Sequence, residues 1–413
     1  MWQHSGKVAI VGIGHSPINR HWDEKPENSL GGLTIDAVEQ AAADAGIPLK
    51  DIDGLFGSPW ALGDAWSPRP VPAPMAERYQ MTPNDPEDGI SKVTSGWLAR
   101  NMGLKNLKVQ QDIQAFLGAN INNAIEAVAA GRCKCAVVIR SLNNFQGRYG
   151  QSGPNAGNEA RGANQFTMPY GQAGPAGFAV YLTRYLWKYN LKPDDLADFA
   201  VNNRRNALMQ DHGYWAENEP IPLTKEDYML ARWICWPIRL FDCDLPVMAA
   251  GAFIITTADR AKDLKHPPVY VLGHGGNAVQ ARGLEEIEAG NATVARRTWE
   301  SAGLGPKDMD FANLYDGYAV FTPLWIEAFG LAGKGDGIAF LKPERIAIEG
   351  SFPFNTSSSN AAGRTHGVSH LYDAVVQIRG EAGPRQVKKH ELGLVETGPP
   401  PNGHAQVLSR SPR

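Results

Sequence analysis

The chain has 413 residues, enough for one large or two ordinary domains, and 43% of them are hydrophobic, so a sizeable core is available. Its net charge of −3 gives no electrostatic case for binding nucleic acid or an anionic membrane, and no apolar run is long enough to predict a membrane span. The four cysteines have no paired metal-binding spacing and are too few for a disulfide framework, so we expect a cytoplasmic protein without a metal site on this chain.

The first predicted unit is a strand, a helix and a second strand. Residues 7–14 (KVAIVGIG) predict a buried strand because a continuous apolar run ends in glycine. Residues 33–45 show the apolar spacing of a helix that ends at Gly46, and residues 53–56 predict the next strand. The Gly-Ile-Gly of the first strand invites a dinucleotide-binding interpretation. Pro17 lacks the N–H group that a phosphate site would use there, so we do not assign one.

The same unit occurs a second time in the chain. A strand is predicted at 268–273 and a helix at 292–302. Residues 302–310 then repeat residues 45–53, with five of the nine positions identical. This agreement in the same strand–helix–strand setting predicts two related halves. The predicted halves are residues 1–262, with an inserted region at about 141–236, and residues 267–413.

Two further helices are predicted at equivalent places in the two halves. Residues 118–131 (GANINNAIEAVAAG) and 367–380 (GVSHLYDAVVQIRG) have the same length and are bounded by glycines. Small apolar residues stand where a surface helix would carry charges, so we expect both helices to be buried between sheets. In the inserted region, residues 143–172 predict a long functional loop, and residues 202–206 (NNRRN) predict the solvated polar face of a helix.

A candidate site follows the predicted strand that begins at Met309. Tyr315 and Asp316 stand at the end of this strand, and Gly317 breaks it. Side chains at the end of a buried strand commonly point into the pocket of an α/β enzyme. The alternative interpretation is that Tyr315 is a packed aromatic ring at a turn.

The order of these segments resembles that of the thiolase superfamily, and in particular its lipid-transfer-protein (sterol-carrier thiolase-like) branch, over nearly the whole chain. The resemblance implies an α/β fold of two duplicated halves in a five-layered αβαβα arrangement, usually in a homodimer. Its most specific segments are residues 237–247 (PIRLFDCDLPV) and 355–367, with KVAIVGIG, GANINNAIEAVAAG, NNRR and Tyr315-Asp316-Gly317 in support.

The departures from the thiolase pattern decide which function the resemblance implies. Thiolases carry a nucleophilic cysteine in the loop before the central helix, and this loop reads DIQAFLG here, with Ala115 near the place of the nucleophile. Cys133 and Cys135 come a full helix later, and the Gly-His-Pro loop of thiolases reads Gly363-Arg364-Thr365. A covalent acyl-enzyme is therefore not expected.

What is left resembles the thiolase-like aldolases of steroid side-chain breakdown, in which a tyrosine replaces a histidine of the thiolase motif. Tyr315 matches that tyrosine. The resemblance implies a lyase that cleaves a β-hydroxyacyl-CoA, with a steroid or another bulky side chain, by a retro-aldol step into a ketone or aldehyde and a shortened acyl-CoA. The second tyrosine of that family is missing here, so Arg364, His366 or Tyr318 are the candidates for its role.

The roles follow from the chemistry that a retro-aldol step needs. Tyr315 is the expected acid–base group, and because a free phenol titrates near pKa ~10, a cation such as Arg364 is expected beside it. Arg364 could instead hold the enolate oxygen, and His366 could return the proton. Packing or capping is the alternative for His366, and holding the turn is the alternative for Asp316. The expected substrate-binding residues are Asp316, Asn355, Ala115 and Gly367.

The resemblance also implies what this chain binds. We expect an acyl-CoA thioester as substrate, no cofactor on this chain, and an OB-fold and zinc-ribbon partner protein that would carry any zinc. Trp233 and Trp236 are candidate contacts for that partner. Two other functions stay open, namely a condensing acyltransferase of the thiolase type and a non-catalytic acyl-CoA- or lipid-binding subunit of a complex.

Overall fold

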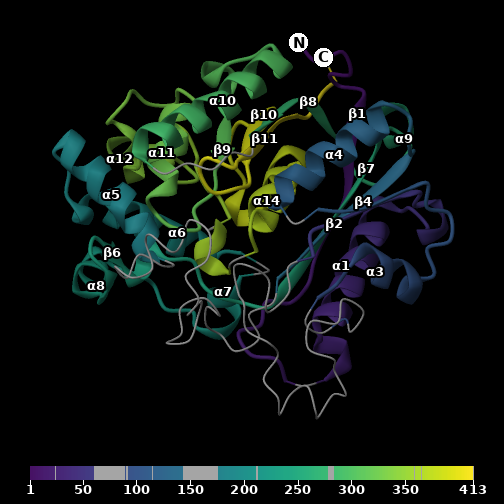
Figure 1. Cartoon of the computed structure of the whole chain (residues 1–413), viewed down its shortest axis with the longest axis horizontal. Helices are drawn as coiled ribbons and strands as arrows, with labels where there is room; N and C mark the ends of the chain where they lie inside the picture. Colours follow the sequence, from purple (N-terminus) through teal and green to yellow (C-terminus); the bar gives the residue numbers. More distant parts are fainter. Residues whose placement is uncertain are drawn as a thin grey trace.

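The computed structural model describes residues 1–23, 25–59, 89, 92–113, 115–142, 175–210, 213–277, 283–357, 359–363 and 365–412. Within these residues nine strands form one mixed sheet, and helices pack on both of its faces (Figure 1). This confirms the expected α/β fold class. In the described ranges, none of the helices combines the length and the apolar character that crossing a membrane requires.

The two halves contain similar elements in a similar order. The first half consists of β1 (Val8–His15), α1 (Leu30–Ala45), β2 (Gly54–Gly57), α3 (Ser95–Met102), β3 (Val109–Asp112), α4 (Leu117–Ala129), β4 (Cys135–Leu142), β7 (Ala249–Thr257) and α9 (Ala258–Ala261). The second half consists of β8 (Val269–Gly276), α10 (Leu284–Ala302), β9 (Phe311–Asn313), α11 (Phe321–Ala328), α12 (Gly337–Phe340), α13 (Pro343–Ile346), α14 (Val368–Arg379), β10 (Leu392–Glu396) and β11 (His404–Ser409).

The region between β4 and β7 adds further elements, and short 3-10 turns connect others. The added elements are α5 (Pro175–Tyr189), α6 (Ala197–Leu208), α7 (Tyr214–Asn218), α8 (Lys225–Leu230), β5 (Trp233–Cys235) and β6 (Ile238–Arg239). The 3-10 turns are Pro26–Asn28, Leu49–Asp51, Pro193–Leu196, Leu240–Asp242, Pro306–Asp308, Ser359–Ala362 and Gly383–Arg385.

Hydrogen bonds join nine strands into one mixed sheet with the order β3-β2-β4-β7-β1-β8-β11-β10-β9. The halves meet where β1 pairs with β8 in antiparallel fashion, Ala9 opposite Tyr270 and Ile10 opposite Val269. Outward from this junction the order is β1, β7, β4, β2 in one half and β8, β11, β10, β9 in the other. The same order at corresponding places in the chain confirms the predicted duplication.

The repeated nine-residue segment has the same backbone conformation in both halves. α1 ends at Gly46 with φ +68°, and α10 ends at Gly303 with φ +66°, a left-handed conformation that glycine adopts without a steric penalty. Each glycine is followed by a 3-10 turn and then by a strand, β2 or β9. The predicted strand end at Tyr315 is thus the second-half counterpart of the end of β2.

Helices α4 and α14 are buried against strands of both halves, as their small apolar residues predicted (Figure 1). Their core contacts come from strands of both halves. This cluster includes Ile10, Phe253, Val271 and Val395 from strands, with Ile121, Ile125, Leu371 and Val375 from the two helices. Both helices begin at the edge of the sheet where β9 and β10 end, so the loops before them can carry functional groups into one region.

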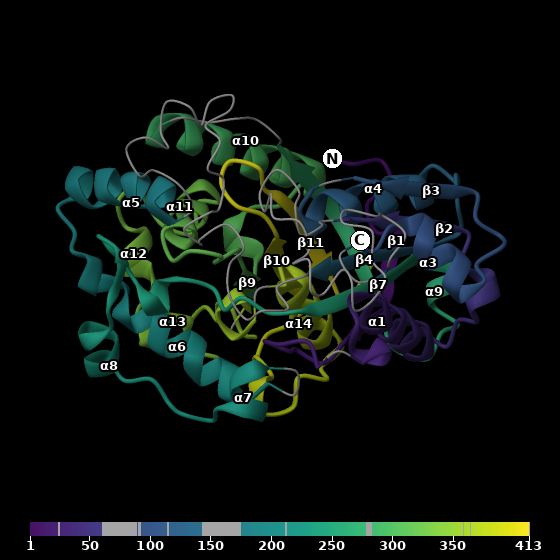
Figure 2. The ribbon, with the colours of Figure 1, turned by 60° about the horizontal axis from the view of Figure 1, so that its bottom comes forward.

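The added helices pack against the second half, although the sequence attaches them to the first. Leu182 and Tyr185 of α5, Phe199 of α6 and Tyr228 of α8 belong to the same buried cluster as Phe321. Figure 2 shows α5, α6, α8 and α12 gathered on that side of the molecule. The functional loop predicted at 143–172 lies outside the described residues.

The glycines of the opening strand serve helix packing. A Cβ at Gly14 would lie 1.9 Å from the Ala37 carbonyl oxygen and 2.7 Å from the Ala41 amide nitrogen, so α1 rests directly on the backbone of β1. Gly12 faces the Ala41 carbonyl oxygen in the same way. This contact gives the Gly-Ile-Gly a structural reason.

Gly14→Ala is expected to destabilise the protein, because two rigid backbones would have to separate to admit the methyl group. We expect a loss of about 1–3 kcal/mol in the free energy of unfolding, measured by urea denaturation. Gly177→Ala in α5 is the matched control, since its Cβ would meet no atom of the described residues within 4 Å. Its free energy of unfolding is expected to rise by about 0.4–1 kcal/mol, because alanine restricts the unfolded chain more than glycine does. Equal stability of the two variants would contradict this packing.

Candidate functional site

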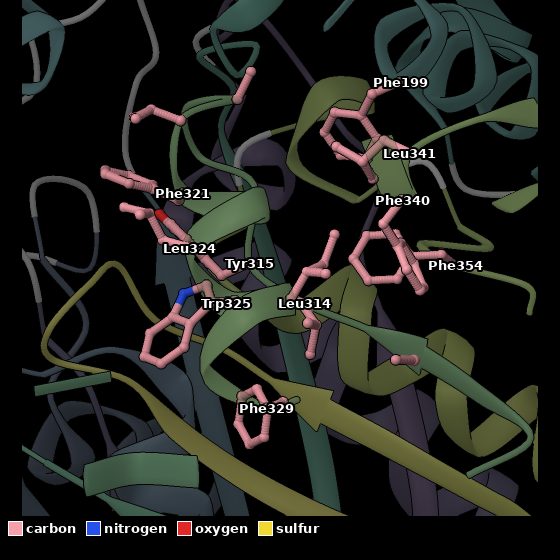
Figure 3. Close-up of a cluster of buried hydrophobic side chains, with 14 of the residues drawn as sticks. Phe199, Leu314, Tyr315, Phe321, Leu324, Trp325, Phe329, Phe340, Leu341 and Phe354 are labelled. Atoms are coloured by element: carbon pink, nitrogen blue, oxygen red, sulfur yellow. The ribbon is translucent and has the colours of Figure 1, made fainter. Parts of the chain in front are cut away.

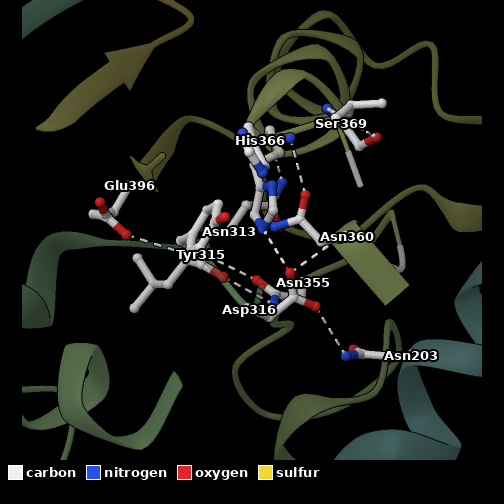
Figure 4. A network of polar contacts seen from close by, with 12 residues as sticks. Asn203, Asn313, Tyr315, Asp316, Asn355, Asn360, His366, Ser369 and Glu396 are labelled. Atoms are coloured by element: carbon white, nitrogen blue, oxygen red, sulfur yellow. Dashed lines mark hydrogen bonds and ion pairs between the residues drawn. The ribbon is translucent and has the colours of Figure 1, made fainter. Parts of the chain in front are cut away.

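The site begins at the end of β9, where the chain turns through Leu314, Tyr315 and Asp316 (Figure 4). The Asn355 side chain holds this turn on both sides of Leu314: its Oδ1 accepts from the Leu314 N–H at 2.8 Å and its Nδ2 donates to the Leu314 carbonyl at 3.0 Å. The Tyr315 N–H donates to Glu396 Oε2 at 3.3 Å. Side chains from two neighbouring segments therefore fix the backbone on which Tyr315 stands.

The Tyr315 ring is surrounded by aromatic rings from three other segments. Its centroid lies 5.7 Å from Phe116, 6.1 Å from Phe321, 6.3 Å from His366 and 6.0 Å from His370. Figure 3 shows Tyr315 within the cluster that also contains Leu314, Phe321, Leu324 and Trp325. Only 3% of Tyr315 is exposed, so the ring is packed as the alternative interpretation expected, and it is packed against both histidines of the 363–370 segment.

Asp316 is buried and accepts hydrogen bonds from both flanking segments. Its Oδ1 accepts from the Asn360 N–H at 3.0 Å and lies 3.2 Å from His370 Nε2. Its Oδ2 accepts from Asn203 Nδ2 at 3.3 Å. The carboxylate thus ties α6, the 3-10 turn Ser359–Ala362 and α14 to the end of β9. This is the turn-holding role that was the alternative to substrate binding.

The amide-rich segment 202–206 was predicted to be a solvated helix face, and this prediction is wrong. Asn203 and Asn206 on α6 are buried, and Asn206 Nδ2 donates to the Asn355 carbonyl at 3.0 Å. Arg205 alone is exposed, in an ion pair with Glu349. The reason is tertiary: the polar ends of β9 and its neighbouring loops need donors, and α6 supplies them.

His366 lies in the turn before α14 and has a backbone conformation that is uncommon outside glycine. Its φ is +48°, and Asn355 is similar at +47°. Such conformations cost free energy and concentrate at functional sites. The His366 N–H donates to Asn360 Oδ1 at 3.1 Å, and the ring packs 5.0 Å from Phe116. The structure therefore brings His366 and Tyr315 into one buried site, as the sequence predicted.

The other predicted site residues lie in different surroundings. Arg364 lies outside the described residues. Tyr318 packs on Phe178 of α5, 4.8 Å between ring centroids, and on Phe321 at 5.7 Å. Ala115 accepts a hydrogen bond through its carbonyl from Arg140. Gly367 has φ +100°, and a Cβ there would collide with Thr397, so this position needs glycine.

Three buried polar residues of the site were not expected from the sequence. Arg140 stands in β4, and its Nη2 lies 2.6 Å from His366 Nδ1. Glu396 ends β10, and His370 follows His366 by one helical turn. Signals for all three were present: Arg140 and Glu396 are lone charges in the buried strands CAVVIRSL and LGLVE, and His370 has the i, i+4 spacing of a shared helix face.

Burial raises the pKa of Glu396 well above its usual value, although backbone N–H groups of Tyr315, Gly398 and His404 act in the opposite direction. The carboxyl is completely buried. Burial therefore favours the neutral form of this carboxyl, which accepts from the Tyr315 N–H.

Glu396→Gln is expected to keep the fold, because an amide replaces a neutral carboxyl of the same shape. Glu396→Ala is expected to cost about 1–3 kcal/mol, since the Tyr315 N–H would lose its acceptor. The pKa of Glu396 is higher in the folded protein than in the unfolded chain, where it is about 4.3. The wild-type free energy of unfolding therefore falls as the pH rises above about 4.3, because the folded protein binds this proton more tightly. Glu396→Gln removes this contribution. Urea denaturation midpoints at a series of pH values test both expectations. An equal loss of stability in Glu396→Gln and Glu396→Ala would contradict them.

None of the four thiols of the chain is placed as a nucleophile. Cys133 and Cys135 lie beyond the far end of α4, about 20 Å from its start for a helix of this length, and burial raises their pKa to about 11 and about 12. Burial also raises the pKa of Cys235 and Cys243. Among the described residues, no group of three or more His, Cys, Asp and Glu side chains is arranged to hold a metal ion.

Comparisons with known proteins agree with this geometry. Residues 278–405 match the family described as thiolase C-terminal domain-like. The chain is 29% identical, over 97% of its length and 98% of the relative, to 17-hydroxy-3-oxo-4-pregnene-20-carboxyl-CoA lyase of Mycobacterium tuberculosis. It is 26% identical to the steroid side-chain-cleaving aldolase of Thermomonospora curvata, with 91% of both chains covered.

A solved structure of similar fold is that of the Ltp2–ChsH2(DUF35) aldolase. It superposes with a TM-score of 0.79, covers 99% of both chains and is 24% identical in sequence. The similarity spans both halves and the added helices, so it bears on the whole fold.

Proposed function

Because this chain belongs to the thiolase superfamily, we propose that it is a thiolase-like aldolase, a lyase that cleaves a β-hydroxyacyl-CoA by a retro-aldol reaction. The products would be a ketone or aldehyde and a shortened acyl-CoA. The two curated relatives, a CoA lyase and a side-chain-cleaving aldolase, support a carbon–carbon lyase and a steroid or similarly bulky side chain on the substrate.

One observation carries the proposal: a phenol and an imidazole share a buried site, and none of the contacts described for the two rings involves a thiol. The rings of Tyr315 and His366 meet edge to face at 6.3 Å, and Arg140 Nη2 lies 2.6 Å from His366 Nδ1. A thiolase-type acyl transfer needs a thiolate, whereas a retro-aldol step needs only proton transfer and stabilisation of an enolate. The groups present fit the second chemistry.

The proposed reaction balances without any other reactant. Tyr315, acting as its phenolate, takes the proton of the β-hydroxyl and becomes the neutral phenol, the C–O bond becomes a carbonyl, and the Cα–Cβ bond breaks. Its electron pair passes into the thioester as an enolate. The same phenol then returns the proton to the α-carbon, which gives the shortened acyl-CoA. The burial of the site favours these steps because electrostatic interactions are stronger where water is excluded.

The proposal includes a partner protein of the DUF35 kind, which we expect to contain an OB-fold and a zinc ribbon. The similar structure of an Ltp2–ChsH2(DUF35) aldolase supports this. A surface around β5 and β6 supports it as well, because Trp236 is 60% and Leu230 is 78% exposed, with Trp233 and Leu240 beside them. Exposed apolar groups of this size mark interaction surfaces.

We also propose a homodimer in the reducing cytoplasm. β3 is the last strand at one end of the nine-stranded sheet and alternates between half-buried and exposed residues, which suits pairing with a second copy. All four cysteines are unpaired, which suits a reducing compartment.

The function is tested by incubating the chain, alone and with a DUF35-type partner, with β-hydroxyacyl-CoA thioesters of branched and steroidal acids. We expect equal amounts of a carbonyl product and a shortened acyl-CoA, identified by mass spectrometry. Exchange of the acyl group onto free CoA without carbon–carbon cleavage would instead show an acyltransferase.

A further inference from the structure

Arg140 is a charged residue at the centre of the molecule for which the reaction above gives no task. It lies in β4 opposite Gly251 of β7, and only 1% of it is exposed. A buried guanidinium is costly unless acceptors meet its N–H groups. Its presence in an otherwise apolar strand therefore calls for a specific function.

The guanidinium contacts three segments that come from both halves of the chain. Nη1 donates to the carbonyl oxygens of Ser58, at 3.3 Å, and Ala115, at 3.2 Å. Nη2 lies 2.6 Å from Nδ1 of His366. The Phe116 ring stands 5.9 Å from the guanidinium carbon. Arg140 thus joins the end of β2, the loop before α4 and the turn before α14.

The contact with His366 determines where the imidazole carries its proton. Arginine has donors only, so His366 Nδ1 must accept, and the proton of the neutral ring is then on Nε2. A second proton on Nδ1 would break this bond and place two cations side by side. Among the described residues around the ring, Phe116 and Asn360 are uncharged and Tyr315 is a titratable phenol; Tyr315 in turn stacks on His370, which pairs with Asp316.

We propose that Arg140 is a positioning residue that holds His366 as the neutral Nε2–H tautomer, which makes the imidazole a hydrogen-bond donor to the enolate oxygen. This role rests on the proposed function of the site, in which Tyr315 alone moves the proton. It changes the expected task of His366, because a neutral ring donates a hydrogen bond well and gives up a proton poorly. A fixed donor aimed at developing charge is an effective form of transition-state stabilisation.

The first test reads the tautomer directly and needs no turnover. With ¹⁵N-labelled histidine in the full chain, and His366→Gln to assign the signal, we expect an acceptor-type Nδ1 and a donor-type Nε2 for His366 from pH 6 to pH 8. In Arg140→Met, which keeps the length of the side chain without its donors, His366 is expected to titrate near its ordinary pKa of ~6.5. Titration near this value in the wild-type protein would overturn the proposal.

The second test uses the pH profile of kcat/KM. In Arg140→Met, kcat/KM at the optimal pH is expected to fall about 100-fold. Its pH profile is expected to gain an acid limb near pH ~6.5, below which kcat/KM falls about tenfold per pH unit. Arg140→Lys is expected to recover little, since a single ammonium cannot reach all three partners.

The control is Arg379→Met, which removes another buried arginine. Arg379 bonds Asp44 and the Val11 carbonyl at the far end of α14. Its loss is expected to lower stability without adding the acid limb. An acid limb in Arg379→Met, or none in Arg140→Met, would overturn the proposal. If the tautomer is as expected but no carbon–carbon cleavage occurs, the proposed function fails and the positioning of His366 by Arg140 stands.

Discussion

Tyr315→Phe is expected to lower kcat by about 10²–10⁴-fold, the range that general acid–base groups contribute. The change removes one oxygen and leaves the ring, so the contacts with Phe116, Phe321 and His370 are kept. Stability is therefore expected to stay within about 1 kcal/mol of the wild-type value. The measurement is kcat for carbon–carbon cleavage, with a thermal melt of the same sample.

Tyr185→Phe is the matched control for this variant. Tyr185 is also a buried tyrosine, but its hydroxyl bonds the Glu327 carboxyl between α5 and α11, away from His366. Losing that bond is expected to cost about 1 kcal/mol of stability and to leave kcat unchanged. If Tyr315→Phe kept kcat within a factor of about two, Tyr315 would not be the acid–base group.

Asp316→Ala is expected to cost about 3–5 kcal/mol in the free energy of unfolding, because its buried partners would lose their acceptor together. These partners are the Asn360 N–H, the Asn203 amide and the His370 ring. Activity is expected to fall as well, since Asn360 also holds the His366 backbone. Urea denaturation and kcat on the same preparation measure the two effects.

The control is Asp259→Ala, which removes a surface carboxylate. Asp259 is paired with Lys262 at 3.1 Å, but its side chain is 96% exposed, so we expect a change below about 0.5 kcal/mol. If Asp316→Ala lowered the free energy of unfolding by no more than Asp259→Ala does, the network in Figure 4 would not hold the site together.

Local sequence patterns were sufficient for most of the fold. The apolar runs and terminal glycines located β1, α4 and α14, and the repeat of residues 45–53 at 302–310 gave the duplicated topology. Two helix starts were set too late. α1 begins at Leu30, where two glycines obscure the helical pattern, although the Ser29 hydroxyl caps it by accepting from the Gly32 N–H at 3.1 Å. α10 begins at Leu284, and its first turns are mostly polar and so lack the apolar spacing.

The candidate site was only partly predictable because most of its contacts join distant segments. Tyr315 and His366 could be found, since each belongs to a short motif next to a strand or helix end. The partners of these residues depend on strand register and on packing. Arg140 faces His366 across 226 positions, and Asn203 reaches Asp316 across 113. Spacing in the sequence cannot predict such pairs. A single charged residue in a predicted buried strand does, however, indicate a candidate site residue.

Cys133 and Cys135 illustrate the same limit. Their i, i+2 spacing would place both thiols on one face of a strand that covered them, but β4 begins only at Cys135. Cys133 packs with the central helices, and Cys135 packs with the outer layer around α1. The period-two rule applies only within a strand, so it does not relate the two thiols.

The central claim is that this protein breaks a carbon–carbon bond by proton transfer, without an acyl group on sulfur. Mass spectrometry of the intact protein, quenched in acid during turnover of a β-hydroxyacyl-CoA, tests it most directly. We predict an unmodified protein mass while the carbonyl product and the shortened acyl-CoA accumulate in equal amounts. A protein carrying an added acyl mass on one of its four cysteines would contradict the account.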